Sequence, residues 1–164
     1  QVFAGVPVNP PAPPPTTLQV IPDNPNRFDI PEYTGGIDSD FTIEWLQYMH
    51  TDNAFPRVYS IGQYPAQNAV SIEGDTLYLW LNGSPASEMM PSDYLDKWYH
   101  IVVTRKADNI LVWAGDSSDT YTKLIDTTNS DAIPTNGLDF YIGSENAPDT
   151  YYNGLISNFR WSKD

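Results

Sequence analysis

The chain contains a series of short runs in which apolar and polar residues alternate with a period of two. In FTIEWLQYMH, Phe41, Ile43 and Trp45 fall on one side of an extended backbone. In TLYLWL the leucines fall on one side, and Tyr78 and Trp80 fall on the other. This alternation is typical of strands that bury one face, because successive side chains point to opposite sides of a sheet. The sequence therefore predicts an all-β protein.

Glycine, asparagine, aspartate and proline separate these runs at the spacing of hairpins. Gly74 and Asp75 interrupt AVSIEGDTLYLWLNG, and residues 106–109 interrupt WYHIVVTRKADNILVWAG, so each stretch is expected to form an antiparallel hairpin. RVYSIG, TYTKLID, LDFYIGS and GLISNFRWS supply further strands. One short helical turn is expected in SEMMPSDYLDKW, where Ser92 can cap it. Short strands at this spacing predict an antiparallel sandwich or barrel.

A proline-rich arm precedes the alternating runs. Eight of the fifteen prolines lie in residues 1–26, where fixed φ angles and missing N–H groups disfavour both a helix and a central strand. The cluster in residues 10–15 favours polyproline II. We therefore divide the chain into an extended arm, 1–26, and a folded domain, 27–164. The arm is interpreted as a spacer to a parent protein or assembly, or as a segment packed on the domain or a neighbouring chain; a PxxP ligand is a further alternative.

The composition excludes several classes of function. The 164 residues carry a formal net charge of −13, and such an acidic surface repels nucleic-acid phosphates and anionic membranes. No apolar run approaches the roughly 20 residues of a membrane-spanning helix. The chain contains no cysteine, so disulfides and thiolate metal sites are excluded. We expect neither nucleic-acid binding nor membrane insertion.

Four motifs occur in a characteristic order: FTIEWLQY, DKWYHIVVTRKADNILVWAG, LDFYIGS and NGLISNFRWS. The residues that carry this pattern are Trp98, His100, Ile101, Val103, Thr104, Ile142, Gly143, Gly154, Ile156, Phe159 and Arg160. The pattern resembles the laminin G-like branch of the concanavalin A-like lectin/glucanase superfamily over residues 27–163. The resemblance implies an antiparallel two-sheet β-sandwich of the jelly-roll type, carried behind the extended Pro-rich N-terminal arm.

His100 is interpreted as a structural residue in the middle of a strand. A catalytic histidine needs a partner within reach, and the sequence contains no G-x-S-x-G nucleophile elbow. Retaining glycosidases need two carboxylates about 5 Å apart, and the glucanase members of the superfamily carry them in an E-x-D-x-x-E run that this chain lacks. The nearest carboxylates, Asp38, Asp40 and Glu44, are interpreted as solvated charge. We therefore expect no catalytic residues and no enzymatic activity.

A ligand-binding rim is predicted from strand parity. If all strands alternate up and down as simple hairpins, the loops near 34–40, 63–68, 82–97, 115–120 and 144–152 meet at one end. Acidic groups and tyrosines can bind calcium and stack on sugars, although a merely solvated polar rim is the alternative. The acidic residues of this rim are Asp38, Asp40, Glu88, Asp93, Asp96, Asp116, Asp119, Glu145 and Asp149. The expected ligand-binding tyrosines are Tyr64, Tyr94, Tyr151 and Tyr152.

Calcium is the cofactor that the resemblance implies. Laminin G-like domains often hold calcium at such a rim, using an aspartate just before the strand that matches AVSIEG. Asn68 stands near that position and offers an oxygen without the charge. Asp116, after ILVWAG, and the nearby Asp119 are the acidic candidates. We therefore expect Asn68, Asp116 and Asp119 as metal ligands.

The expected function is that of a noncatalytic, lectin-like recognition module. It would bind a carbohydrate or a partner protein's surface through the rim, displayed on a secreted, cell-surface or virion protein. The alternative is a structural or decoration domain of a larger assembly, such as a virus or phage particle, attached through the arm. A glycoside hydrolase is the third alternative. Glycan binding separates the first two, and hydrolysis of laminarin would indicate the third.

Overall fold

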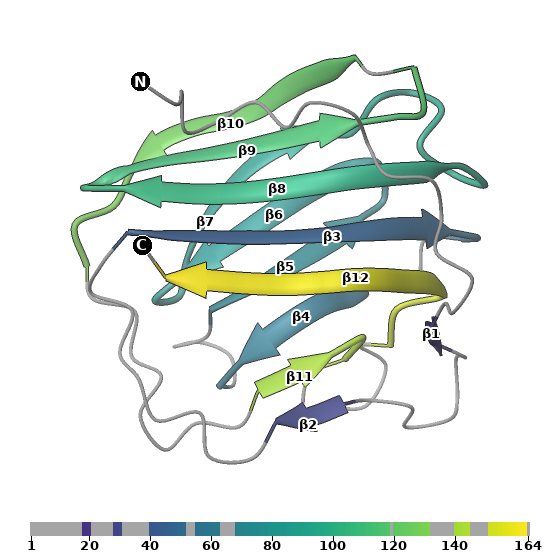
Figure 1. Ribbon diagram of the computed structural model, residues 1–164, viewed down its shortest axis with the longest axis horizontal. Coiled ribbons are helices and arrows are strands. Elements are labelled where there is room, and N and C mark those ends of the chain that lie inside the picture. The colour runs from purple at the N-terminus through teal and green to yellow at the C-terminus, as the bar shows by residue number, and fades with distance from the viewer. Residues whose placement is uncertain are drawn as a thin grey trace.

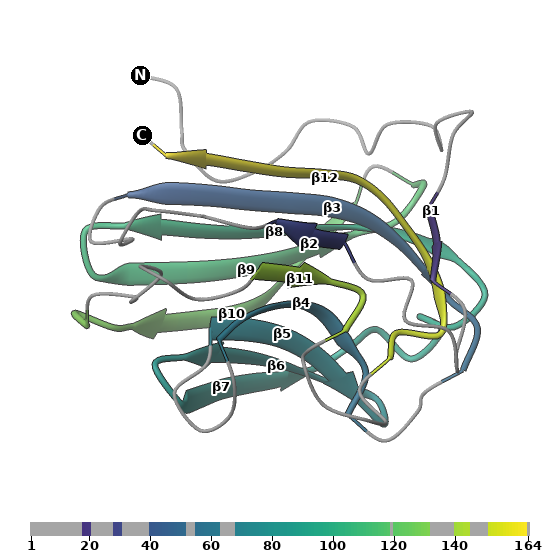
Figure 2. The ribbon, with the colours of Figure 1, turned by 90° about the horizontal axis from the view of Figure 1, so that it is seen from below.

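The structure, a computed structural model, describes residues 18–20, 28–30, 40–51, 55–62, 68–118, 120–131, 140–144 and 151–163. In 18–20, 28–30 and at residue 163 this description covers the backbone alone. Two six-stranded antiparallel sheets pack face to face (Figures 1 and 2), which confirms the predicted two-sheet β-sandwich. The first sheet, in spatial order, contains β1 (Leu18–Val20), β12 (Gly154–Lys163), β3 (Phe41–Met49), β8 (Trp98–Lys106), β9 (Asn109–Gly115) and β10 (Tyr121–Thr128). The second contains β2 (Phe28–Ile30), β11 (Phe140–Ile142), β4 (Arg57–Ile61), β5 (Asn68–Glu73), β6 (Thr76–Leu81) and β7 (Ser84–Met89).

Both predicted hairpins form. The β5–β6 hairpin turns at Gly74, whose φ of 60° lies in the left-handed region that glycine adopts freely. The β8–β9 hairpin turns at Ala107 and Asp108. The helical turn expected after Ser92 is wrong, because Ser92 and Asp93 form a simple turn. Within the part of the chain that the structure describes, there is no helix long and apolar enough to cross a membrane.

Strand β7 is one of three strands, with β1 and β2, that the sequence pattern missed, and it is the one that affects the loop assignments. Its residues, SPASEM, are almost all exposed, and it forms the outer edge of its sheet against β6. An edge strand with no buried face needs no alternation of apolar residues, so the period-two signal is absent. The extra strand reverses the chain once more between Asn82 and Met90. The loops that precede β7 along the chain therefore lie at the opposite end of the sandwich from the one that the sequence analysis assigned to them.

The proline-rich arm contributes one short strand to the sandwich. β1 lies within residues 1–26 and pairs with β12, with Leu18 opposite Ile156 and Val20 opposite Gly154. It occupies the edge of its sheet, the position in which a proline-flanked strand is tolerated. Gly154 is required at this pairing site, because a Cβ there would come within 2.0 Å of the Tyr48 carbonyl oxygen.

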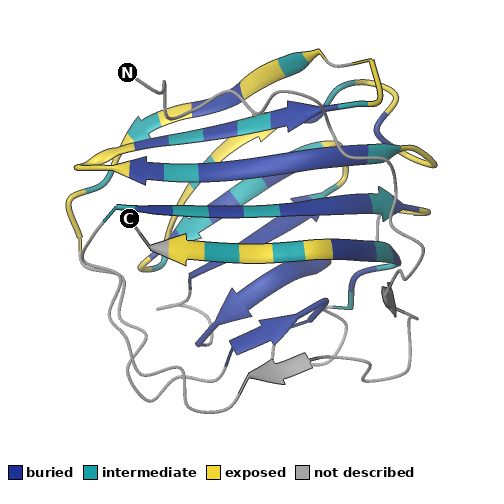
Figure 3. Ribbon diagram, in the orientation of Figure 1, coloured by how far each residue is buried: buried dark blue, intermediate teal, exposed yellow. Residues whose placement is uncertain are grey.

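The core lies between the two sheets and is aromatic around Tyr59. The ring of Tyr59 packs edge-on against Trp45 of β3 and Phe140 of β11, at centroid distances of 6.0 and 6.2 Å. Full burial raises the pKa of the Tyr59 hydroxyl. Figure 3 shows the same burial along β4, β8 and β11. Aromatic packing of this kind joins the two sheets.

A bulge in β12 sets the direction of its last side chains. The pairing with β3 shifts between Ser157 and Arg160, and Asn158 takes a φ of 51°. The one extra residue at this bulge reverses which of the later side chains of β12 point toward the core. Phe159 therefore packs on Trp45, with ring centroids 6.2 Å apart, while Arg160 lies beside Glu44 on the outer face.

Candidate functional site

Five interstrand connections meet at one end of the sandwich, which we call the loop rim. The backbone N–H of His50, at the end of β3, donates to the carbonyl of Asn153 at 3.0 Å. The Tyr94 hydroxyl donates to the carbonyl of Gly74, which brings the β5–β6 turn to the same end. The loop rim comprises residues 50–51, 55–56, 74–75, 90–97, 116–118 and 151–153.

The predicted rim is wrong in part, because β7 was missed. Asp40 lies at the opposite end of the sandwich, where its carboxylate accepts a hydrogen bond of 2.6 Å from the N–H of Ala107. Asn68 begins β5, whose far end leads to Gly74 at the loop rim. Of the predicted loop 82–97, only residues 90–97 belong to the loop rim. Asp38, Asp119, Glu145, Asp149 and Tyr64 lie outside the described residues.

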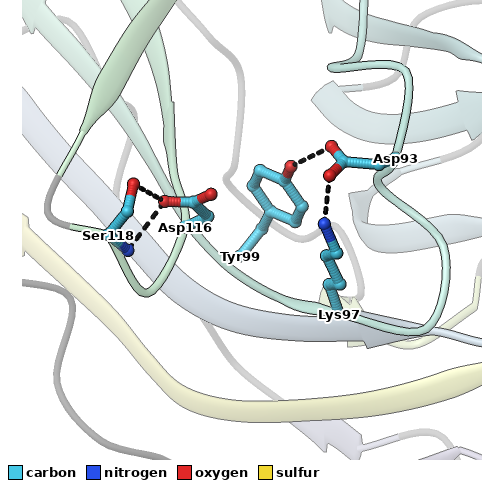
Figure 4. A network of polar contacts seen from close by, with 5 residues as sticks. All are labelled: Asp93, Lys97, Tyr99, Asp116 and Ser118. Atoms are coloured by element: carbon cyan, nitrogen blue, oxygen red, sulfur yellow. Dashed lines mark hydrogen bonds and ion pairs between the residues drawn. The ribbon is translucent and has the colours of Figure 1, made fainter.

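Two acidic side chains of the loop rim are held in a polar network (Figure 4). Asp93 accepts a hydrogen bond of 3.0 Å from the Tyr99 hydroxyl and forms an ion pair with Lys97. The bonds from Lys97 and Tyr99 hold the pKa of the Asp93 carboxyl below its usual range. Asp116 accepts hydrogen bonds from the side chain and backbone of Ser118, which lower its pKa as well. Both carboxylates are therefore ionised at neutral pH.

The described residues do not assemble the expected calcium site. Asn68 lies at one end of β5, and six residues of strand span roughly 17 Å, so Asn68 and Asp116 cannot share one ion. Asn68 is also buried, and its side-chain amide has no hydrogen-bond partner among the described groups. The Lys97 ammonium already neutralises Asp93. No group of three or more histidine, aspartate or glutamate side chains is gathered for a metal in the described part of the chain. The calcium expectation now depends on Asp116 and on Asp119.

A group of aromatic side chains lies on the outward side of β3 and β8, next to the loop rim. The ring of Tyr48 meets the Trp98 ring at 5.6 Å and 62°, and the His50 ring at 5.1 Å and 68°. His50 Nδ1 lies 3.2 Å from a carboxylate oxygen of Asp96. The Asp96 and His50 side chains are 66% and 47% exposed, and Tyr48 and Trp98 are partly exposed. Rings and polar groups therefore reach solvent together here.

The backbone fixes these side chains relative to one another. The N–H of Asp96 donates to the carbonyl of Met49 at 2.8 Å, and Asp96 takes a φ of 55°. The Asn153 amide donates to the Thr51 hydroxyl. Three segments that are distant in sequence thus present one preorganised polar edge next to the rings of Tyr48 and Trp98.

Two of the four predicted tyrosines are part of the core rather than of a binding surface. Tyr152 is 0% exposed, and burial raises the pKa of its hydroxyl. Tyr94 is buried and donates to Gly74. The expectation that these two bind a ligand is corrected, because neither ring is accessible. Tyr151 is partly exposed at the loop rim and stays a candidate. The sequence pattern did place Tyr48 opposite the core-facing residues of its strand, and this signal could have identified it.

His100 is buried and bonded on both ring nitrogens. Nε2 lies 3.0 Å from a carboxylate oxygen of Glu44, and Nδ1 lies 2.8 Å from the Tyr121 hydroxyl. The other oxygen of Glu44 lies 2.8 Å from a guanidinium nitrogen of Arg160. This chain of contacts joins β12, β3, β8 and β10 on the outer face of their sheet. These contacts hold His100 in place within β8, and its interpretation as a structural residue stays a prediction. Glu44, which was interpreted as solvated charge, is a bonded group instead.

No protein-family model and no curated protein sequence matches this chain. Solved structures do match its fold. Mouse laminin α1 domains LG4-5 superpose with a TM-score of 0.66 and 12% identity, over 89% of this chain and 40% of theirs. The enzymatically active domain of bacteriophage CBA120 tailspike protein 2 gives 0.65 and 15%, over 90% of this chain and 25% of that one. A Limulus polyphemus pentraxin gives 0.62 and 14%, over 87% and 73%. The chain therefore spans well under half the length of the laminin and tailspike chains, and it has the concanavalin A-like jelly-roll fold seen in laminin G domains.

Proposed function

We propose that this domain is a noncatalytic recognition module that binds carbohydrate through the loop rim. The observation that carries the proposal is the aromatic group of Tyr48 and Trp98 beside the polar edge of His50, Asp96 and Asn153. A sugar ring has an apolar C–H face and a perimeter of hydroxyl groups. A site for it needs an aromatic surface together with a few fixed donors and acceptors.

The loop rim offers both classes of polar group. The Asp96 carboxylate accepts hydrogen bonds, and the Asn153 amide offers both a donor and an acceptor. Their positions are fixed by main-chain bonds to Met49 and His50, so little ordering is required when a ligand binds. Fixed polar groups improve affinity because their conformational entropy is lost during folding and not when the ligand binds.

The two carboxylates of the polar network, Asp93 and Asp116, are unsuited to glycoside hydrolysis. A hydrolase of the two-carboxylate type needs a general acid that is still protonated near neutral pH. Hydrogen bonds lower the pKa of both Asp93 and Asp116, so neither is suited to that role. We therefore propose a module within a larger extracellular, cell-surface or virion protein that holds a glycan and does not cleave it.

A binding experiment on an immobilised glycan array, followed by titration calorimetry with the strongest hit, tests the proposal. Trp98→Ala should weaken binding at least about tenfold, the loss typical of an aromatic anchor. Lys106→Ala, at the opposite end of the sandwich, should bind the glycan with the same affinity as the unmutated protein. Hydrolysis of laminarin by the parent protein would contradict the noncatalytic assignment.

A decoration role is the second candidate, favoured by the fold similarity to a phage tailspike domain. That role would be favoured if the domain binds no glycan on the array and if its deletion from the larger protein disturbs assembly. In that case substitutions at Tyr48 and Trp98 would have no effect on assembly.

A further inference from the structure

A second aromatic surface lies on the other sheet, far from Tyr48 and Trp98 in the fold. Along β6 the leucines point into the core, and Tyr78 and Trp80 point outward. Their rings are nearly parallel, with centroids 6.2 Å apart and planes inclined by only 24°. Both rings are partly exposed. We call this pair the β6 platform.

A bonded framework fixes Trp80 in one orientation. Its indole N–H donates to the Ser71 hydroxyl at 3.2 Å, and that hydroxyl donates to Glu73 at 2.9 Å. The Arg57 guanidinium carbon lies 5.7 Å from the centre of the Trp80 ring, and Arg57 pairs with the same Glu73 oxygen at 3.1 Å. The Arg57 side chain is only 5% exposed. A buried arginine on the outward side of a sheet, paired and stacked in this way, is a costly arrangement that holds one exposed ring in place.

Small side chains flank the platform on β7. Pro85 stands opposite Trp80, and Ser87 stands opposite Tyr78, both exposed. Met89, 59% exposed, lies at the end of the same strand. Pro85 and Ser87 are short residues beside the two rings, and the longer Met89 stands opposite Thr76 rather than opposite either ring. The two partly exposed rings therefore follow one another along β6 with only short side chains directly opposite them.

We propose that the β6 platform binds an extended neutral polysaccharide, independently of the loop rim. Two nearly parallel rings that follow one another along a strand, with centroids 6.2 Å apart, match successive sugars of a chain better than a single compact ligand. Polar groups of Glu73 and Ser87 lie beside the rings and can form hydrogen bonds with the hydroxyl groups of a sugar. The formal net charge of −13 disfavours an anionic polymer.

Native gel electrophoresis through gels that each contain laminarin, dextran or arabinan tests this proposal. The unmutated protein should be retarded by at least one of these gels. Tyr78→Ala and Trp80→Ala should each weaken the retardation at least about tenfold. Tyr78→Phe and Trp80→Phe keep a ring in place and should retain most of it. Lys106→Ala, at the end of β8 and remote from both aromatic surfaces, should be retarded like the unmutated protein. Trp98→Ala, beside the loop rim, reports whether the retardation depends on that site instead. Thermal melting confirms that each variant is folded, and Tyr78→Ala keeps the test decisive if Trp80→Ala does not fold.

The outcomes separate this proposal from the previous one. Retardation that survives in both Tyr78→Ala and Trp80→Ala overturns the platform. Retardation lost only in Trp98→Ala also overturns the platform, while it leaves the loop rim as the binding site. Absence of retardation in all three gels overturns the platform as well, whereas glycan binding on the array would still support the loop rim.

Discussion

His100 Nε2 lies 3.0 Å from the Glu44 carboxylate across the neighbouring strands β8 and β3. On the other side of the ring, Nδ1 lies 2.8 Å from the Tyr121 hydroxyl. A neutral imidazole satisfies both contacts when Nε2–H donates to Glu44 and Nδ1 accepts from Tyr121. Burial lowers the pKa of His100, and the nearby Glu44 carboxylate opposes this shift only in part. The folded protein therefore favours the neutral ring.

We predict that stability falls with pH below about 6.5 because of His100. A histidine whose pKa is lower in the folded state than in the unfolded state binds its proton more readily after unfolding. Its contribution is present above the unfolded pKa and is lost as the pH falls toward the folded pKa. Urea unfolding between pH 5 and 8 should show this slope, and His100→Gln should flatten it. His50→Gln is the matched control and should keep the slope; equal slopes in the parent and His100→Gln would contradict the prediction.

Gly115 is required because the Tyr121 ring lies over it. A Cβ at Gly115 would come within 2.4 Å of that ring, so Gly115→Ala must displace Tyr121 from His100. We expect a loss of roughly 1–3 kcal/mol in the free energy of unfolding. In a Tyr121→Ala background the same change should cost much less, because the clash is gone. A double-mutant cycle by denaturant unfolding measures this coupling, and additive effects would show that the two residues do not depend on each other.

The arm should matter for stability only through β1. A chain shortened to begin at Thr17 should melt within about 2–4 °C of the full chain, a shift equivalent to roughly 1 kcal/mol at this size. A chain that begins at Asn26 loses the pairing of β1 with β12 and exposes that edge, so its Tm should fall by a further 2–8 °C or so. Calorimetry compares the three chains. A fall of more than about 10 °C on removal of residues 1–16 alone would show that the early arm contributes to the core.

The calcium expectation makes a prediction that centres on Asp116. If the ion binds there, 10 mM calcium at a Kd of about 0.1 mM adds roughly 2.7 kcal/mol to stability, or about 5–10 °C in Tm. Asp116→Asn should remove most of that rise, and Asn68→Asp should not increase it, because Asn68 lies at the other end of the sandwich. Sodium chloride at matched ionic strength controls for the screening of so acidic a protein. Equal shifts with sodium and calcium would contradict a specific site.

The strands that bury one face can be recognised from the amino-acid sequence without the structure. Alternation in β3, β6 and β8 is a local consequence of packing a sheet on a core, so it is legible without any partner strand. The same alternation implies an outward direction for Glu44 and Tyr48 in β3, which the structure shows. It also predicted that His100 lies in the middle of a strand, and His100 does lie within β8.

Which loops share an end of the sandwich, and which outward side chains meet, depends on how all the strands assemble. β7 has no buried face and so leaves no periodic signal, yet its presence moves Asn68 and Asp40 away from Asp93 and Asp116. The contact between His100 and Tyr121 depends on the register of three strands and on a glycine between them. Burial of Tyr152 likewise depends on its place in the core cluster that residues of both sheets form together. Such relations arise between segments distant in the chain, where the local pattern of one strand carries no information about its neighbours.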